Sequence, residues 1–369
     1  MTTVADLSAW LEDFAPRSLA EPWDNVGLLW GDPASTIRSV MTCLTVTSRT
    51  ADEALEGSAG AIVSHHPVLF KAVKTVRADS VETGYLWRLA RGNVAVLSPH
   101  TSFDNTAGGI NDGLAARLGL TDVTSLRPGP VTVRDKVAVF VPRGHRAAVL
   151  EAAFAAGAGR IGGYDECSFT TRGRGTFFGT EGTNPTVGLA GRRETVAEWR
   201  VEFVCPRPAL AAVIGAIRRV HPYEEPAIDV IPLGDEPPSG PGSGRIGRLR
   251  GREALGALAK RVGIELGTNS VQFVGDPDRP IGRLAIVCGA GDDFLADAAS
   301  VGADALLTGE ARFHRGLEAE AIGVGLIVAG HHATERPGVE DLARRIGAAF
   351  PDLEVWPSRI EADPFRSTS

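Results

Sequence analysis

Six of the eight histidines in this 369-residue chain lie at the ends of four short apolar segments, two near each end of the chain. Residues 61–64, 94–98, 305–307 and 325–329 have the length and composition of buried strands. The histidines that follow them are His65, His66, His100, His314, His331 and His332. Because chance would scatter histidines along the chain, the clustering favours one shared site over isolated surface or capping histidines.

Three of these strand ends also place a carboxylate four residues from a histidine. The pairs are His100 with Asp104, Glu310 with His314, and His331 with Glu335. If a helix begins at each strand end, the two members of a pair project from one helical face. Imidazole and carboxylate together are the ligands expected for zinc, iron or manganese. The pattern therefore predicts a metal or proton-transfer site.

The two ends of the chain also share their spacing. The strand around Cys43 precedes His65 by 22 residues, and the strand around Cys288 precedes Glu310 by 22 residues. We infer a diverged internal duplication. In the first half, strands at 37–46, 61–64 and 94–98 alternate with helices at 49–57 and 82–90, which is typical of a parallel α/β sheet that binds ligands at the carboxyl ends of its strands.

The middle of the chain follows another pattern. We expect a strand at 135–141, a helix at 147–157, a glycine-rich turn at 176–185, a strand at 198–204, a helix at 209–220 and a strand at 227–233. This order predicts a ferredoxin-like α+β insert, followed by a flexible linker over 234–244. Helices are then expected at 252–262 and 339–350. The predicted domains are lobe 1 at 1–130, the insert at 131–236 and lobe 2 at 237–369.

Composition restricts the partners and the compartment. The net charge is −7 and basic residues form no run, which disfavours nucleic acids and anionic membranes and favours a small-molecule partner. A basic-then-apolar leader and an 18-residue apolar stretch are both missing from the sequence, so we expect a cytoplasmic protein. The four cysteines are far apart and are expected to be structural thiols.

Two loops left alternatives open. Asp24 and Asn25 could hydrogen-bond a metal ligand or only their own turn, and the sequence favours neither. Lys71, Lys74 and Arg77 could hold a phosphate, although a solvated loop is the default for such a cluster.

Five short motifs in order resemble the interacting-factor-three-like family, whose members are called GTP cyclohydrolase 1 type 2 homologues. They are Trp-Asp-Asn-Val-Gly-Leu at 23–28, Ser-His-His-Pro at 64–67, His100 to Asp104 with Gly-Gly-Ile-Asn-Asp at 108–112, Thr-Gly-Glu at 308–310, and Gly-His-His-Ala-Thr-Glu at 330–335. Segments 159–164, 181–185 and 221–225 resemble the inserted domain of the longer bacterial members.

The resemblance implies two related α/β lobes with a dinuclear metal site between them, interrupted by a PII-like or CutA-like insert, and a toroidal homohexamer. By position, the family's metal ligands match His65, His66, Asp104, His331 and Glu335, and His100 would line the same cavity. Many relatives have aspartate where this chain has Glu310, so the role of Glu310 stays open.

Five side chains give two metal ions three ligands each only if one carboxylate, Glu335 or Asp104, bridges them. Such a centre can supply a hydroxide at neutral pH. One hypothesis is a hydrolase for a nucleotide or another phosphorylated small molecule. For GTP ring opening, His100, His314 or Glu310 would carry protons. Against this hypothesis, the sequence lacks a phosphate-binding loop of the G-x-x-x-x-G-K type. The alternative is a regulatory or metal-handling hexamer with a ligand-sensing insert. The open site favours the first hypothesis, and the sensor-type insert favours the second.

Overall fold

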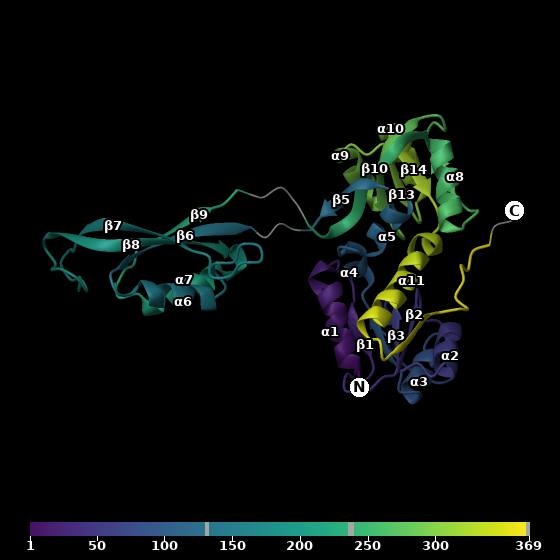
Figure 1. Cartoon of the computed structure of the whole chain (residues 1–369), viewed down its shortest axis with the longest axis horizontal. Helices are drawn as coiled ribbons and strands as arrows, with labels where there is room; N and C mark the ends of the chain where they lie inside the picture. Colours follow the sequence, from purple (N-terminus) through teal and green to yellow (C-terminus); the bar gives the residue numbers. More distant parts are fainter. Residues whose placement is uncertain (130–132, 235–239, 367–369) are drawn as a thin grey trace. The chain divides into compact units, whose positions relative to one another are not determined.

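A computed structural model describes residues 1–129, 133–234 and 240–366. The chain divides into two compact units (Figure 1). Unit 1 combines residues 1–129 with residues 239–369, and unit 2 comprises residues 130–238. The two ends of the chain therefore fold together, with unit 2 inserted between them in sequence.

The first sheet of unit 1 has the strand order β1-β4-β3-β2-β15. The strands are β1 (Gly27–Trp30), β2 (Ser39–Cys43), β3 (Ala61–Ser64), β4 (Ala95–Ser98) and β15 (Glu354–Pro357). All neighbouring pairs are parallel except β1 with β4. The central strands are fully buried, since α1 (Val4–Phe14) packs on one face and α2 (Ser48–Glu56) with α3 (Gly84–Arg91) on the other. Burial on both faces explains why these strands are apolar without alternation.

The second sheet of unit 1 has the order β11-β14-β13-β12-β10-β5. Its strands are β5 (Thr121–Pro128), β10 (Gly242–Ala254), β11 (Gln272–Val274), β12 (Pro280–Val287), β13 (Ala305–Thr308) and β14 (Gly325–Val328). The helices around it are α8 (Leu255–Leu266), α9 (Leu295–Ser300) and α10 (Phe313–Ile322). Strands β12, β13 and β14 are parallel and adjacent in that order, as β2, β3 and β4 are in the first sheet.

Three helices connect the two sheets: α4 (His100–Asn105), α5 (Ile110–Arg117) and α11 (His331–Ala349). Helix α11 contacts β2 and β15 of the first sheet and also α5 and α8 (Figure 1). One continuous apolar core includes Val40 and Leu97 of the first sheet, Leu114 and Leu342 of the helices, and Leu284 of the second sheet. The carboxyl ends of strands from both sheets are thereby fixed in one rigid unit.

Unit 2 has the element order β6 (Arg134–Pro142), α6 (Arg146–Ala155), β7 (Phe169–Phe178), β8 (Arg193–Pro206), α7 (Leu210–Val220) and β9 (Ile228–Pro232). Its antiparallel sheet has the order β7-β8-β6-β9. The core residues Val137, Val139 and Val141 of β6 pack with Val149 of α6 and Val213 of α7. Because strand residues alternate between faces, Phe140 of β6 belongs to the face opposite these helices.

Some element boundaries differ from those expected. The predicted linker 234–244 ends in strand β10, which begins at Gly242 because it pairs with β5; residues 235–239 lie outside the described part. Pairing of β10 with β12 extends the strand to Ala254, so the helix predicted from 252 begins at Leu255. Helix α11 begins eight residues before the predicted 339, with Pro337 inside it. None of the described helices is long and apolar enough to cross a bilayer.

Removal of unit 2 is expected to leave a folded unit 1. The backbone N–H of Gly129 donates to the carbonyl of Pro241 at 3.1 Å, and Pro128 pairs with Gly242 in the β5–β10 ladder. A short turn replacing residues 130–240 can therefore join strands that are already neighbours. We expect a cooperative unfolding transition with Tm within about 5 °C of the full chain and an unchanged metal content. Loss of soluble expression or of bound metal would show that unit 2 is needed for the fold of unit 1.

Candidate metal centre

The candidate site is assembled from strand ends of both sheets of unit 1. His65 and His66 follow β3, and His100 begins α4 two residues after β4. Glu310 follows β13, and His331 begins α11 just after β14. Parallel strands end at the same edge of a sheet, so the backbone directs these side chains to a common region.

His66, His331 and Glu335 form one of the two groups in the described part of the chain that could hold a metal ion. Glu335 Oε2 lies 3.0 Å from His66 Nε2 and 3.1 Å from His331 Nε2, and the two Nε2 atoms are 3.3 Å apart. Donor atoms about 2.0–2.1 Å from a tetrahedral zinc are separated by about 3.3 Å. The three atoms therefore fit one face of such a coordination shell.

His65 supplies the second group, with His66 and His100. Its Nε2 lies 3.7 Å from Asp104 Oδ1 and 3.7 Å from Glu335 Oε1. The imidazole is buried, and neither ring nitrogen has a hydrogen-bond partner among the described residues. Buried polar atoms nearly always have partners, so an orphaned imidazole facing two carboxylates fits a metal ligand.

Glu335 connects the two groups. Its Oε1 faces His65, whereas its Oε2 faces His66 and His331. Burial alone would raise the pKa of this carboxyl, but the surrounding histidines outweigh burial and hold its pKa well below the usual value. The side chain also fills its space closely, since a Cβ at Gly289 would come within 2.1 Å of Oε1. An ionised carboxylate is thus fixed with one oxygen toward each group.

Hydrogen bonds orient three of the imidazoles. Glu310 Oε1 lies 2.8 Å from His331 Nδ1, Thr45 Oγ1 lies 2.8 Å from His66 Nδ1, and Asp24 Oδ1 lies 2.7 Å from His100 Nδ1. Metal-binding histidines commonly use their second ring nitrogen in this way. These bonds leave Nε2 of His66 and His331 free to face the centre. The sequence did not predict this role of Thr45. Thr45 follows β2, and His66 follows β3, the neighbouring strand, so the two residues lie close together.

Cys288 hydrogen-bonds the fifth matched residue, Asp104. Its Sγ donates to Asp104 Oδ1 at 3.2 Å. Burial, reinforced by Asp104 and Glu335, raises the pKa of the Cys288 thiol well above its usual value, so the group stays protonated. In this structure Cys288 therefore acts as a hydrogen-bond donor to Asp104.

A cavity of about 520 Å³ opens onto this cluster. Its lining includes the five residues His66, His100, Asp104, His331 and Glu335, together with Trp23, Phe70 and Arg127. The loop residues Lys71, Lys74 and Arg77 do not line it. Arg127 instead supplies positive charge, and its guanidinium pairs with Asp297 and lies 4.0 Å from the centre of the Phe294 ring.

The structure separates Glu310 from His314. Helix α10 begins only at Phe313, so the two residues do not share a helical face as the spacing suggested. His314 is exposed, its ring contacts Phe313, and it does not line the cavity. For the other two pairs, α4 begins at His100 and α11 at His331, as the spacing required. His332 lines a different cavity beside Arg336.

Asp24 holds His100 in place and also bonds its own turn, since its Oδ1 accepts a hydrogen bond from the backbone N–H of Asn25 at 2.8 Å. Its Oδ2 accepts a hydrogen bond from the backbone N–H of Thr101 at 3.1 Å, and Oδ1 meets His100 Nδ1. Although burial opposes ionisation, these hydrogen bonds lower the pKa of Asp24 to about 2. Asn25 serves the neighbouring loop, since its Nδ2 donates to the carbonyl of Leu69.

Asp24→Asn is expected to destabilise the protein by about 1–3 kcal/mol, because charge-assisted hydrogen bonds are replaced by weaker ones. Asp24 has a folded-state pKa below its unfolded value of about 3.9, so its ionisation stabilises the fold above pH ~4. That contribution is lost as the pH falls from 4 to 2. Chemical denaturation at pH 7 and at pH 3 measures the difference between the proteins. A penalty that does not shrink on acidification would contradict the assignment.

Comparison with known proteins identifies the family to which this chain belongs. Residues 2–364 match the model of Duf34/NIF3 (NGG1p interacting factor 3). A Mycobacterium tuberculosis protein named GTP cyclohydrolase 1 type 2 homolog is 39% identical over 356 residues, covering 94% of this chain and 93% of the relative. A Bacillus subtilis protein of the same name is 34% identical, covering 96% of this chain and 95% of the relative.

Solved structures agree with this match. A Bacillus cereus protein related to NIF3 superposes with a TM-score of 0.73 at 32% identity, over 99% of both chains. Staphylococcus aureus protein SA1388 gives a TM-score of 0.83 at 28% identity, again over 99% of both chains. The chain therefore belongs to the Duf34/NIF3 family.

Proposed function

We propose that this protein is a dinuclear metal-dependent hydrolase that acts on a nucleotide or another phosphorylated small molecule. The observation that carries the proposal is the placement of Glu335, whose Oε1 faces His65 and whose Oε2 faces His66 and His331. A carboxylate fixed in that way suits two ions better than one. Two divalent ions of zinc, iron or manganese per subunit match the imidazole and carboxylate donors.

The distances to the two Glu335 oxygens indicate which donors would hold each ion. His65 and Asp104 would hold one ion with Glu335 Oε1, and His66 and His331 would hold the other with Glu335 Oε2. Ions bound in this way would supply a hydroxide near neutral pH, the nucleophile of many hydrolases. Each ion would have three protein ligands, which leaves room for water and substrate.

His100 is the best-placed proton carrier. Its ring centre lies 5.1 Å from that of His65 and 5.6 Å from that of His66, and it lines the cavity. Asp24 fixes the orientation of its ring through Nδ1. Glu310 would act on the reaction by orienting His331. His314 is exposed and does not line the cavity, so the direct proton-transfer role is assigned to His100.

A nucleotide suits the other walls of the cavity. Trp23 is 61% exposed and Phe70 is 51% exposed, and their rings meet edge to face at 5.9 Å. Large exposed rings beside a reactive centre are suited to stack on a base. Arg127, which pairs with Asp297 in this structure, would exchange that partner for a phosphate. The relatives named GTP cyclohydrolase 1 type 2 homolog suggest GTP as the first nucleotide to test.

A second candidate is a regulatory or metal-handling assembly with little turnover. Unit 2 forms its own compact domain, and its β-α-β-β-α-β order with the sheet order β7-β8-β6-β9 supports a ferredoxin-like domain of the PII or CutA kind. Such a domain would sense a ligand within a toroidal homohexamer. This candidate accounts for unit 2, whereas the hydrolase accounts for the open metal centre.

A turnover screen separates the two candidates. Protein loaded separately with zinc, iron or manganese is incubated with GTP and other nucleotides, and products are followed by chromatography. The hydrolase predicts metal-dependent turnover that Glu335→Gln abolishes and His332→Ala preserves. Protein that holds two ions per subunit and turns over none of the nucleotides would favour the regulatory assembly.

A further inference from the structure

Unit 2 contains a cavity of about 540 Å³ that the metal chemistry does not use. It lies among the ends of β6 and β7, strand β8, and the loops around 183–187 and 223–227. Its apolar walls include Phe140, Phe177, Phe178, Val187 and Tyr223. The volume falls within the range of about 300–1,000 Å³ typical of small-molecule sites.

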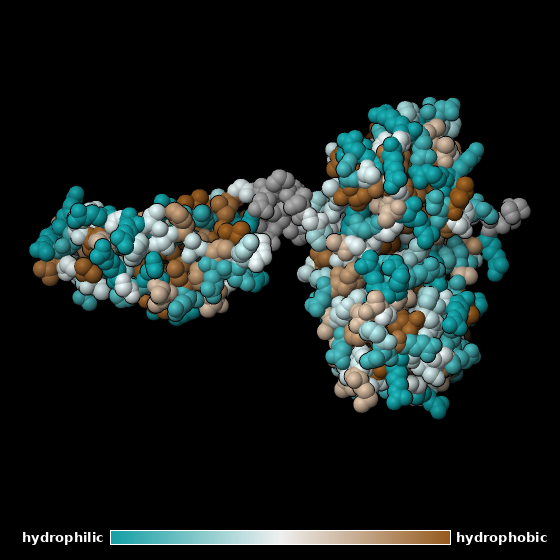
Figure 2. Space-filling view, in the orientation of Figure 1, coloured by the Kyte–Doolittle hydropathy of each residue, from teal (hydrophilic) through white to brown (hydrophobic). Residues whose placement is uncertain are grey.

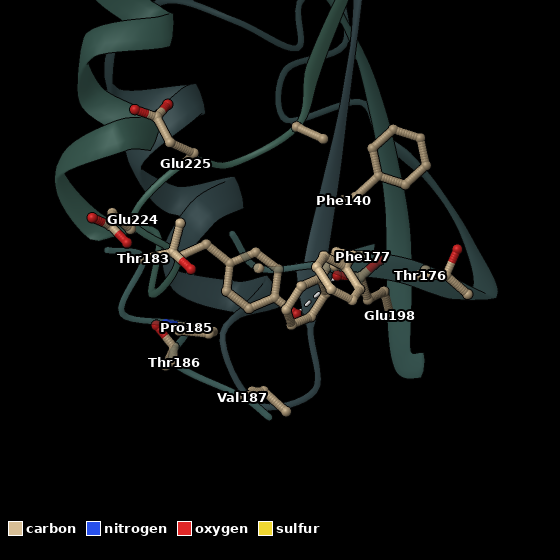
Figure 3. A pocket seen from close by; sticks show the side chains of 15 residues that line it. Phe140, Thr176, Phe177, Thr183, Pro185, Thr186, Val187, Glu198, Glu224 and Glu225 are labelled. Atoms are coloured by element: carbon tan, nitrogen blue, oxygen red, sulfur yellow. Dashed lines mark hydrogen bonds between the residues drawn. The ribbon is translucent and has the colours of Figure 1, made fainter. Parts of the chain in front are cut away.

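All of the charged side chains that line this cavity are acidic. They are Glu198, Glu224 and Glu225. In Figure 3, Glu198 lies beside Phe177 at one end, and Glu224 and Glu225 lie at the other. Within the described part of unit 2, no three metal-ligating side chains converge, so the separated carboxylates do not form a metal site. A negative, aromatic-lined cavity is matched to a positively charged organic ligand.

Glu198 is held in position without being neutralised. The hydroxyl of Tyr223 donates to its Oε1 at 2.8 Å. Its Oε2 packs over the backbone of Gly175, where a Cβ would come within 2.1 Å. Among the described residues, Glu198 forms no ion pair, unlike Glu202 on the same strand, which pairs with Lys136 and Arg200. The Glu198 carboxylate therefore has no positively charged partner among the described residues, and a ligand can supply one.

The nearby histidine does not supply the missing positive charge. His221 Nδ1 accepts a hydrogen bond from the backbone N–H of Tyr223, so this nitrogen carries no proton. Its Nε2 donates to the carbonyl of Phe140 at 3.0 Å. This pair of bonds selects the neutral imidazole.

We propose that this cavity binds an organic cation, an amine joined to an apolar body the size of one or two rings. The ammonium would bond to Glu198, and the apolar body would lie among Phe140, Phe177 and Tyr223. At the Glu198 end of the cavity, the ammonium would be stabilised both by a charge-assisted hydrogen bond and by cation–π attraction to the aromatic rings. The inference does not depend on the proposed hydrolase, and it gives a ligand class to a sensing role for unit 2.

Calorimetric titration of the full chain with three indole probes tests the charge requirement. Tryptamine carries an ammonium, tryptophol replaces it with a hydroxyl, and indole-3-propionate carries a carboxylate. We expect the Kd of tryptamine to be at least about tenfold lower than that of tryptophol, with no measurable binding of the propionate. Equal affinity for tryptamine and tryptophol, or no binding of tryptamine, would overturn the proposal.

Variants then locate the site. Glu198→Gln should raise the Kd of tryptamine about tenfold and leave that of tryptophol unchanged. Gly175→Ala, which displaces the same carboxylate, should act in the same direction. Glu202→Gln is the matched control, because it removes a charge from the same strand outside the cavity. If Glu202→Gln weakens tryptamine as much as Glu198→Gln does, the attraction is a general surface effect and the site assignment is wrong.

Discussion

Glu335→Gln is expected to deplete both of the proposed metal ions, lowering the content from the proposed two per subunit to below about 0.3 after dialysis. The amide keeps the shape of the side chain, so the packing beside Gly289 is preserved. It removes the charge that two adjacent cations would share, and their mutual repulsion is then no longer offset. Mass spectrometry of the dialysed variant measures the loss.

Asp104→Asn is the matched comparison, because His65 is the one histidine among the described residues that forms an ion-pair contact with Asp104. This variant should mainly weaken one ion and retain about one per subunit. If Glu335→Gln keeps one full ion while Asp104→Asn loses both, then Asp104 is the bridging carboxylate and the assignment of Glu335 is wrong.

His331→Ala is expected to remove most of one ion without unfolding the chain. His331 Nε2 faces both His66 and Glu335, whereas its neighbour His332 lines another cavity. Loss of a ligand should weaken metal binding by more than the 10- to 100-fold typical of losing an orienting partner. Glu310→Gln, which weakens the bond to His331 Nδ1, should fall within that smaller range.

His332→Ala controls for the change of residue type beside the site. Its metal content should match that of the unmodified protein, as measured by titration with a metal-sensitive dye. Equal losses in His331→Ala and His332→Ala would mean that the spacing to Glu335 selected the wrong histidine. His65→Ala should also lose metal, because its buried ring has no other partner among the described residues.

The sequence predicted the strand ends well because buried parallel strands are short, apolar and followed by polar side chains. His66, His331 and Glu335 meet as their spacing and the helix beginning at His331 required. The spacing of Glu310 and His314 predicted wrongly that both lie on one helical face. Helix α10 begins only at Phe313, and the pattern of apolar residues does not show that the helix begins three residues after Glu310. Glu310 reaches the site by contacting His331 instead.

Contacts between distant loops could not be read from periodicity. For the basic cluster at 71–77 the sequence favoured a solvated loop over a phosphate site, and Arg127 of β5, rather than this cluster, lines the cavity. Thr45 and Cys288 do not belong to a recognisable sequence motif. The contacts of Thr45 with His66 and of Cys288 with Asp104 depend on the order of strands in the sheets, which the sequence does not show directly. In unit 2, β7, which was not expected as a strand, pairs with β8 as far as Phe178, three residues into the segment expected to be a turn.

Metal stoichiometry of the unmodified protein tests the central claim most directly. The protein is purified without added metal, loaded separately with zinc, iron or manganese, dialysed, and analysed by inductively coupled plasma mass spectrometry against protein concentration. A dinuclear centre predicts two ions per subunit with at least one of these metals. Saturation at one ion per subunit with every metal would contradict it.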